Sequence, residues 1–322
     1  MNIDGLEDSL HERLSRGREL REAHLQGLGI ELPTSLMEIA AIGIDTNVLK
    51  ALRKDLPAAE QLFLTLGASG VRLIVPSQTL TEYWNNHQLF AEEEGSGFRG
   101  DLTSLKTRLE RANFSGFGSE VLDDIASLVD RVAGDLEDPK SPAYFQKSVD
   151  LVKTMLASAV VPHVSRSRFA DLGAVRLFSK FPPGFADEKD KAAASGGDFF
   201  VWCDFLLGCM LGQPTPRDRY LWVTNEAKRD WKTSAHGHPS LVEEFYSVCE
   251  GELSIVNFAQ LNRIVREDEK KRATEERAAE RAADALADGA GADSPVPENL
   301  ASAAAPNENV AKLAGSAEAY RG

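Results

Sequence analysis

The chain contains 322 residues, of which 43% are hydrophobic, and it carries a formal net charge of −14 at pH 7. This length allows one large domain or two small ones with a substantial buried core. The excess of acidic residues argues against a protein that coats nucleic acid through bulk electrostatics. It leaves open an enzyme that holds a phosphate-containing substrate through divalent cations, because such a site is itself acidic.

No apolar run in the sequence reaches the roughly 18 residues needed to cross a membrane. The acidic N-terminal segment lacks the basic and then apolar layout of a signal peptide. The three cysteines, Cys203, Cys209 and Cys249, cannot form a disulfide framework, and no Cys/His cluster has zinc-ligand spacing. We therefore expect a soluble, cytoplasmic protein with no membrane partner.

The chain begins with a charged helix and then an apolar strand. Residues 4–28 predict an amphipathic helix, which we assign to an N-terminal extension over residues 1–37. This extension is expected to pack on the domain or on a partner. Residues 38–45 form an apolar run that ends in an acid, which indicates a buried central strand.

A second pair of strand and helix follows. A helix is predicted over residues 47–66, with an interruption or kink at Pro57 because proline cannot donate a backbone hydrogen bond. Residues 71–75 predict the second strand, and Pro76 followed by Ser77 as N-cap starts the next helix. Strands that alternate with helices are typical of α/β proteins.

The middle of the chain, residues 97–160, is predicted to be a helical insertion without strands. Apolar residues at helical spacing mark three helices near 102–109, 121–132 and 145–156. A further short helix is predicted near 169–179, and a Pro-Pro-Gly loop follows it.

The C-terminal part returns to the α/β pattern. A very apolar helix is predicted over residues 198–211, and strands are predicted over 219–224 and 254–257, the last followed by a short helix. The final segment, residues 266–322, reads as a charged helix and then a tail whose composition favours disorder.

Four acids lie where a parallel α/β sheet places functional groups, which is the edge formed by the carboxyl ends of its strands. Carboxylates that converge there repel one another unless a cation lies between them. Mg²⁺ and Mn²⁺ prefer such oxygen ligands, and a pair of these ions can activate a water and stabilise a leaving oxygen at a phosphodiester. The four are Asp45 after the first strand, Glu82 on the helix after the second, Asp198 at the start of the apolar helix, and Glu226 after the third strand.

Each acid also has a purely structural explanation. A helix N-cap explains Asp45 about equally well. Glu82 could occupy a solvated helix position, although aromatic residues follow it. Asp198 and Glu226 could simply favour helix N-termini through the macrodipole. The occurrence of all four acids in this order weakens the separate explanations.

Several motifs stand in a fixed order along the chain. They are Ile44-Asp45-Thr46-Asn47-Val48-Leu49, Val75-Pro76 followed by Glu82-Tyr83-Trp84, the run from Pro182 to Lys189, the run from Gly197 to Trp202, and Trp222-Val223-Thr224 with Lys228-Arg229-Asp230-Trp231. In residue type and order they resemble the PIN-like domain superfamily, specifically the bacterial PIN-like group with a long helical insertion. The resemblance spans roughly residues 40–265.

The resemblance implies a three-layer α/β/α fold with a central parallel sheet, a Mg²⁺ or Mn²⁺ site, and endonuclease activity, usually on RNA. Carried over by position, Asp45, Glu82 and Asp198 are the core metal acids. The fourth acid of the family is usually Asp, whereas Glu226 stands at this position here. Asp230, four residues further on, is a substitute ligand, and the departure puts the second metal in doubt.

The motifs also suggest substrate contacts. Lys189 and Lys228 each lie inside a matched motif and are the best candidates to contact phosphates. Thr46, Asn47 and Thr224 are expected beside the substrate, where the two threonines can orient carboxylates by hydrogen bonding. Other nearby cations are equally well explained as solvated surface: Arg168, Arg176, Lys180, Lys191 and Arg229.

The expected organisation is a nuclease domain over residues 38–265, interrupted by the insertion at 97–160 and followed by the segment 266–322. The leading hypothesis is a metal-dependent endoribonuclease, and the resemblance to PIN-like toxins suggests stress response or antiphage defence. The alternatives are a binding or regulatory module with weak catalysis and a nuclease directed at single-stranded or structured DNA. The terminal helices are compatible with a protein partner or with self-association.

Overall fold

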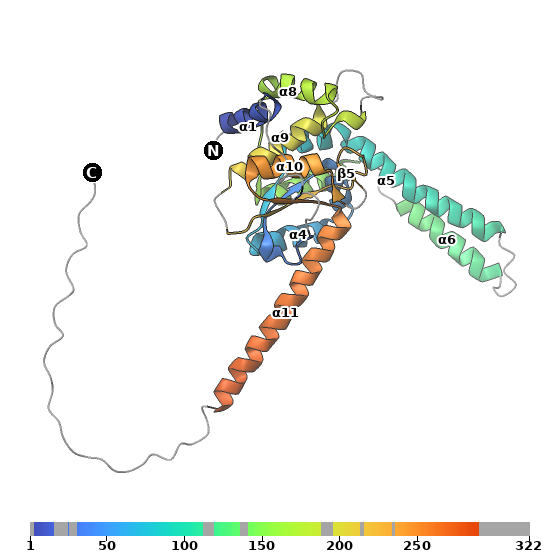
Figure 1. Cartoon of the computed structure of the whole chain (residues 1–322). Helices are drawn as coiled ribbons and strands as arrows, with labels where there is room; N and C mark the ends of the chain where they lie inside the picture. Colours follow the sequence, from blue (N-terminus) through green and yellow to red (C-terminus); the bar gives the residue numbers. More distant parts are fainter. Residues whose placement is uncertain are drawn as a thin grey trace, which may run out of the picture. The chain divides into compact units, whose positions relative to one another are not determined.

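The computed structural model describes residues 3–15, 25, 31–111, 119–135, 141–187, 196–212, 216–233 and 236–289. Its centre is a five-stranded sheet of order β3-β2-β1-β4-β7 in which every neighbouring pair is parallel (Figure 1). The predicted α/β fold with a central parallel sheet is confirmed. The strands are β1 (Ile39–Ile44), β2 (Arg72–Ile74), β3 (Ala159–Val160), β4 (Arg219–Val223) and β7 (Glu252–Val256).

The first predicted strand, β1, is the middle strand of the sheet. All six of its residues are buried, as expected for a strand that is covered on both faces. At Gly43 an added Cβ would lie 2.4 Å from the Phe205 ring and 2.6 Å from the Trp222 ring. The helix that carries Phe205 therefore packs very close to the end of β1 that leads to Asp45.

Helices cover both faces of the sheet, so the fold has three layers (Figure 1). Alternate residues of β1 serve the two cores, because Ile42 packs in one and Ala41 in the other. One face is covered by α3 (Thr46–Leu52), α4 (Leu56–Ala68), the first turns of α5 (Ser77–Arg111), α7 (Pro142–Leu156) and the start of α11 (Phe258–Gly289). The other is covered by α1 (Ile3–Ser15), α8 (Arg166–Phe178), α9 (Gly197–Met210) and α10 (Pro239–Cys249).

The helix predicted over residues 47–66 is two helices, α3 and α4. The break falls before Pro57, which lies in the first turn of α4, where its missing N–H costs no helical hydrogen bond. Asp55 caps α4 by accepting from the Ala58 amide at 3.1 Å. The expected interruption is therefore present, and proline begins a helix here rather than kinking one.

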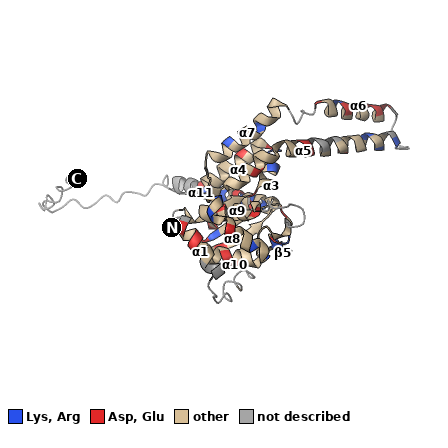
Figure 2. Ribbon diagram, turned by 90° about the horizontal axis from the view of Figure 1, so that it is seen from above, with Lys and Arg blue, Asp and Glu red and all other residues tan. Residues whose placement is uncertain are grey.

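The middle segment is helical, but it does not begin at residue 97. α5 is one helix of 35 residues, so the helix that carries Glu82 continues without a break into the insertion. α6 (Ser119–Asp135) lies beside the far part of α5, and both extend away from the sheet (Figures 1 and 2). The two-residue strand β3 closes the segment, and sequence analysis did not predict it because so short a strand has no periodicity.

Several short elements were also not predicted. Two 3-10 helices, η1 (Leu36–Glu38) and η2 (Phe185–Asp187), lie before β1 and before α9. The strands β5 (Lys232–Thr233) and β6 (His236–Gly237) form a small antiparallel pair.

The N-terminal helix packs on its own domain. Leu6 and Leu10 of α1 are buried in the core formed with α9 and α10. Arg168 of α8 pairs with Asp4 of α1 at 2.9 Å and also contacts Glu7. The apolar face of α1 is thus used inside the chain.

The C-terminal helix α11 is continuous where sequence analysis expected a short helix ending near Val265 and then a separate charged helix. The chain divides into two compact units, Met1–Arg272 and Ala273–Gly322. Residues after 289, which include the tail predicted to be disordered, lie outside the described residues. Within the described ranges, no helix is both long enough and apolar enough to cross a membrane.

Candidate metal centre

Asp45 lies directly after β1, at the carboxyl edge of the sheet. Its backbone N–H donates to the Val223 carbonyl at 3.1 Å, and its Oδ1 accepts from the Thr46 amide at 2.6 Å as the N-cap of α3. Its Oδ2 accepts from the Thr224 hydroxyl at 2.6 Å and from the Asn47 side chain at 2.8 Å. Asp45 is thus a helix cap, and its second oxygen is held by residues from two different strand ends.

Glu82 reaches the same edge from α5. Its Oε2 accepts from the Thr46 hydroxyl at 3.0 Å and its Oε1 from Gln78 Nε2 at 3.1 Å. Thr46 therefore holds two acids, because its amide contacts Asp45 and its hydroxyl contacts Glu82. The Glu82 carboxylate also lies against Gly197, where an added Cβ would be 2.7 Å from Oε1. This contact joins Glu82 to the first turn of α9.

Asp198 and Glu226 lie on either side of a lysine. Asp198 is in the first turn of α9, and its Oδ2 accepts from Trp231 Nε1 at 3.3 Å. The Glu226 amide donates to the Thr224 hydroxyl at 3.0 Å. The Lys228 ammonium is 3.6 Å from Asp198 Oδ2 and 3.6 Å from Glu226 Oε2. A cation of the protein itself therefore lies between these two carboxylates.

The pKa of Asp45 is set first by the burial of its carboxyl group and then by its neighbours. Burial raises the pKa of Asp45 from 3.8 to about 7; the Thr224 hydrogen bond opposes this change and the Asp198 carboxylate adds to it. The Thr46 amide lowers the pKa of Asp45 and the Glu82 carboxylate raises it as smaller effects. Part of the residue still reaches solvent. A cation that approached from solvent would stabilise the charged form of this carboxyl group.

Lys232 of β5 is a site residue that sequence analysis did not single out. Its ammonium donates to the Thr224 carbonyl at 2.9 Å. Partial burial lowers the pKa of Lys232, and the Asp45 and Glu226 carboxylates oppose that change. Lys232 lies one residue beyond the matched motif. In the sequence alone, nothing distinguishes this lysine from a lysine on the solvated surface.

The acids fit a hard divalent cation in charge and in donor type, because all of them offer carboxylate oxygens. In the part of the chain that the structure describes, no three acidic, histidine or cysteine side chains lie close enough together to hold a metal ion. The carboxylates of Asp45 and Glu82 are held by threonines, and that of Asp198 faces Lys228. Coordination would therefore require these side chains to rotate toward a common centre.

Two residues expected at the site are placed differently or are not described. Asp230 is fully buried, and its Oδ2 accepts from the Gly184 amide at 2.8 Å and the Ala186 amide at 3.1 Å. These contacts anchor the Pro-Pro-Gly loop. In this structure Asp230 therefore holds a loop and does not face the other acids. Lys189 lies outside the described residues.

Asp204 joins α9 to the start of α5. It is fully buried, and its Oδ2 accepts from the Ser77 hydroxyl at 3.0 Å and the Gln78 amide at 3.1 Å. The Arg166 guanidinium contacts its two oxygens at 2.9 and 2.8 Å and so neutralises the buried charge. This contact fixes the helix turn that precedes Glu82, so Asp204 has a structural role.

Arg176, a cation near the matched motifs, serves the core rather than the site. It is 2% exposed and pairs with Glu244 at 2.7 Å. Trp202 Nε1 donates to the same carboxylate at 2.6 Å. Because it is buried in this network, Arg176 is not a phosphate contact.

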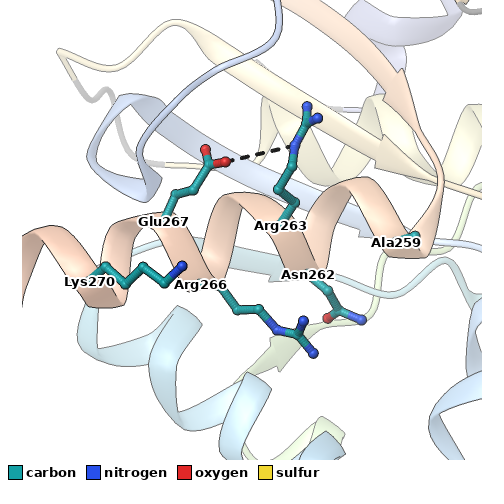
Figure 3. A pocket seen from close by; sticks show the side chains of 6 residues that line it. All are labelled: Ala259, Asn262, Arg263, Arg266, Glu267 and Lys270. Atoms are coloured by element: carbon teal, nitrogen blue, oxygen red, sulfur yellow. Dashed lines mark ion pairs between the residues drawn. The ribbon is translucent and has the colours of Figure 1, made fainter.

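A separate hollow of about 370 Å³ lies along α11. In Figure 3, Arg263 and Glu267 point to one side of the helix, and Asn262 and Arg266 point to the other. The residues that line the hollow all come from α11, so the hollow is distinct from the acidic edge of the sheet. They are Ala259, Asn262, Arg263, Arg266, Glu267 and Lys270.

The chain is an α/β protein with acids at the carboxyl edge of its parallel sheet, which is where such sheets generally bind ligands. The PIN-like domain family model matches residues 41–243, which is more than half of the chain. The chain therefore belongs to the PIN-like domain family and has a nuclease-type fold. Comparisons with curated proteins and with solved structures found no significant match.

Proposed function

We propose that this chain is a metal-dependent endonuclease that hydrolyses phosphodiester bonds, with RNA as its substrate and Mg²⁺ or Mn²⁺ as its cofactor. The observation that carries the proposal is the junction at Thr46, which contacts Asp45 through its amide and Glu82 through its hydroxyl. Gly197 then brings the first turn of α9, which also carries Asp198, against Glu82. These contacts support the proposal that Asp45, Glu82 and Asp198 act together at one edge of a nuclease-type fold.

The three acids Asp45, Glu82 and Asp198 would hold the ion. When bound, the ion would supply an activated water and neutralise charge on the phosphate. Thr224 would keep Asp45 Oδ2 oriented, since its hydroxyl donates to that oxygen at 2.6 Å. Thr46 would do the same for Glu82, so both carboxylates are held at this edge of the sheet before they rotate toward an ion.

Lys228 is the residue that we expect to contact the substrate phosphate. Its side chain is 30% exposed and its ammonium bridges Asp198 and Glu226, so Lys228 lies between the acidic edge and solvent. An ammonium in this place also offsets the charge of Glu226. We therefore propose one firmly held ion, with Glu226 engaged by Lys228 rather than by a second ion.

Asn47 connects the acidic edge to the segment after β4. Its side-chain amide donates to Asp45 and to the Thr224 hydroxyl, at 2.8 and 3.1 Å. Its Oδ1 accepts from the Asn225 amide at 2.8 Å. With these contacts Asn47 holds Asp45 and the segment Thr224–Asn225 together beside the expected position of the scissile phosphate. We therefore assign Asn47 a positioning role.

A second candidate is a PIN-like module that binds nucleic acid or regulates a partner with little catalysis. One observation favours it: within the described residues the acids do not form a ready three-ligand site. Under this alternative, binding would survive the loss of Asp45.

The deciding experiment uses the full chain with labelled single-stranded RNA, in Mn²⁺ or in EDTA, beside Asp45→Asn. We expect cleavage in Mn²⁺ alone and its loss in the variant. Metal-independent cleavage, or undiminished cleavage by Asp45→Asn, would reject the proposal of a metal-dependent endonuclease that uses Asp45. RNA binding without cleavage by the unsubstituted chain would instead support the second candidate.

The same assay identifies the substrate class. Single-stranded DNA and a flap DNA replace the RNA at equal concentration, with Mn²⁺ present throughout. Faster cleavage of RNA supports the ribonuclease proposal. Faster cleavage of either DNA shows that the enzyme is directed at DNA and that the proposed substrate is wrong.

A further inference from the structure

The far part of α5 and the helix α6 form an antiparallel pair, which we call the α5–α6 hairpin. Lys106 on α5 reaches Asp130 on α6 at 2.7 Å, which sets the register of the two helices. Val129 of α6 is 7% exposed on the side that faces α5. Figure 2 shows charged residues along both helices, which extend away from the sheet. The hairpin thus has a narrow core of its own.

A second apolar face of α6 is not used by this core. We call Val121, Ile125, Leu128 and Val132 the apolar stripe, and these side chains are 44%, 36%, 49% and 36% exposed. Their spacing of four, three and four residues places them on one face of the helix. Leu105 of α5 adds a fifth side chain that is 43% exposed. A contiguous apolar patch of this kind on a projecting element marks an interaction surface.

We propose that the apolar stripe binds a second copy of this chain, with the two α6 helices antiparallel. The 4-3-4 spacing reads the same in both directions. A two-fold axis between Ile125 and Leu128 therefore pairs Val121 with the partner's Val132, and Ile125 with the partner's Leu128. The repeat is that of a coiled-coil seam, so both helices can interlock along their length. A two-fold contact is also the commonest symmetry for soluble oligomers.

The charges beside the apolar stripe obey the same symmetry. Asp124 and Arg131 lie along one edge of it, and both are exposed. Under the two-fold axis each Asp124 faces the partner's Arg131, so two ion pairs form. In a parallel pair, each of these residues would face the opposite edge of the partner's stripe, so Asp124 and Arg131 would form no ion pairs with each other. The charge pattern thus selects the antiparallel arrangement of two identical chains.

The acidic ends of α6 work against the contact without abolishing it. Glu120 would approach the partner's Asp135, and both residues are exposed. Solvent and salt screen such end pairs strongly. The apolar stripe and the inner ion pairs lie between these ends, where neighbouring side chains exclude more solvent.

The first test measures the mass of the full chain by light scattering after size exclusion, over a concentration series. We expect about 70 kDa, twice the 35.1 kDa of one chain. Ile125→Asp should give the single-chain mass with unchanged helical content by circular dichroism. Phe178→Asp is the matched control, because Phe178 is 91% exposed outside the stripe, and it should leave the dimer intact. A monomer at every concentration, or a dimer that survives Ile125→Asp, overturns the proposal.

The second test asks whether the axis is antiparallel. Asp124→Arg and Arg131→Asp should each weaken the dimer by about tenfold, because each replaces two attractions by two repulsions. The double variant restores both pairs with reversed signs, so its dissociation constant should return close to that of the unsubstituted chain. A double variant as weak as the single variants together would exclude this arrangement. None of these residues belongs to the metal centre, so the outcome is independent of nuclease activity.

Discussion

Gly197 and Glu82 are in direct contact, such that a Cβ on Gly197 would lie only 2.7 Å from Glu82 Oε1. Gly197→Ala must therefore displace the carboxylate, which otherwise lies between Gln78 and Thr46. We expect metal-dependent cleavage to fall by about one to two orders of magnitude, because small misplacements of catalytic groups have effects of this size.

The control for this change is Gly67→Ala. Gly67 is a helical glycine of α4 at which an added Cβ meets no atom within 4 Å in the described part of the chain. Cleavage by this variant should match the unsubstituted chain. Equal activity of Gly197→Ala and Gly67→Ala would show that the position of Glu82 does not matter.

Thr224 is buried, and its hydroxyl donates to Asp45 while it accepts from the Glu226 amide. Thr224→Val keeps the shape and removes these contacts. We expect Mn²⁺ affinity, measured by calorimetry, to fall about ten- to hundredfold, as for other residues that orient metal ligands. Thr224→Ser keeps the hydroxyl and should bind Mn²⁺ nearly as well as the native chain. Unchanged affinity in Thr224→Val would mean that Asp45 does not bind the ion.

Asp45 should make the metal-free protein less stable as the pH rises. Its pKa is about 7 in the fold against an ordinary value of 3.8, so the fold favours the protonated form. The stability that this carboxyl group contributes is fully present below pH 3.8 and is lost as the pH rises through 7. In EDTA, the unfolding free energy of the native chain should fall relative to that of Asp45→Asn over this window.

Urea denaturation at a series of pH values measures this difference, and added Mn²⁺ tests its origin. The ion competes with the proton, so Mn²⁺ should stabilise the native chain more at pH 8 than at pH 5. Parallel pH profiles for the native chain and Asp45→Asn would contradict the raised pKa of Asp45.

Lys228 should control the number of ions that bind. Its ammonium lies between Asp198 and Glu226 at 3.6 Å from each. Lys228→Met removes this charge and exposes the two carboxylates to each other, which a cation would relieve. We expect Mn²⁺ titration to give one ion per native chain and two per Lys228→Met chain. Lys50→Met, which removes a lysine that pairs with Glu93, is the control and should bind one ion.

Long, regular patterns made most of the fold predictable. Asp45 ends an apolar run and Asp198 opens an apolar helix, so both could be placed at the sheet edge from local sequence. The family motifs placed Glu82 on the helix after β2. β3 could not be predicted, because two residues have no period, and its place depends on hydrogen bonds to β2.

The rest of the site depends on contacts between distant segments. Lys228 reaches Asp198 because the chain turns back after β4, where Trp231 stacks on Trp222 with ring centroids 5.6 Å apart. Asp230 lies in the same turn and points to the loop amides instead. Both residues sit in one charged tetrapeptide, and no periodicity distinguishes a side chain that faces the acids from one that faces the loop.

Because α5 is one unbroken helix, it connects the α5–α6 hairpin rigidly to the acidic edge of the sheet. Its 35 residues correspond to about 50 Å, with Glu82 near one end and the α5–α6 hairpin at the other. The contact of Asp204 with Ser77 and Gln78 fixes the first turn of α5, while the far end of the helix extends into solvent. If pairing of two hairpins tilts α5, the tilt moves the Glu82 carboxylate. Thermodynamic linkage then requires that an ion held by Glu82 strengthen or weaken the pairing by the same factor.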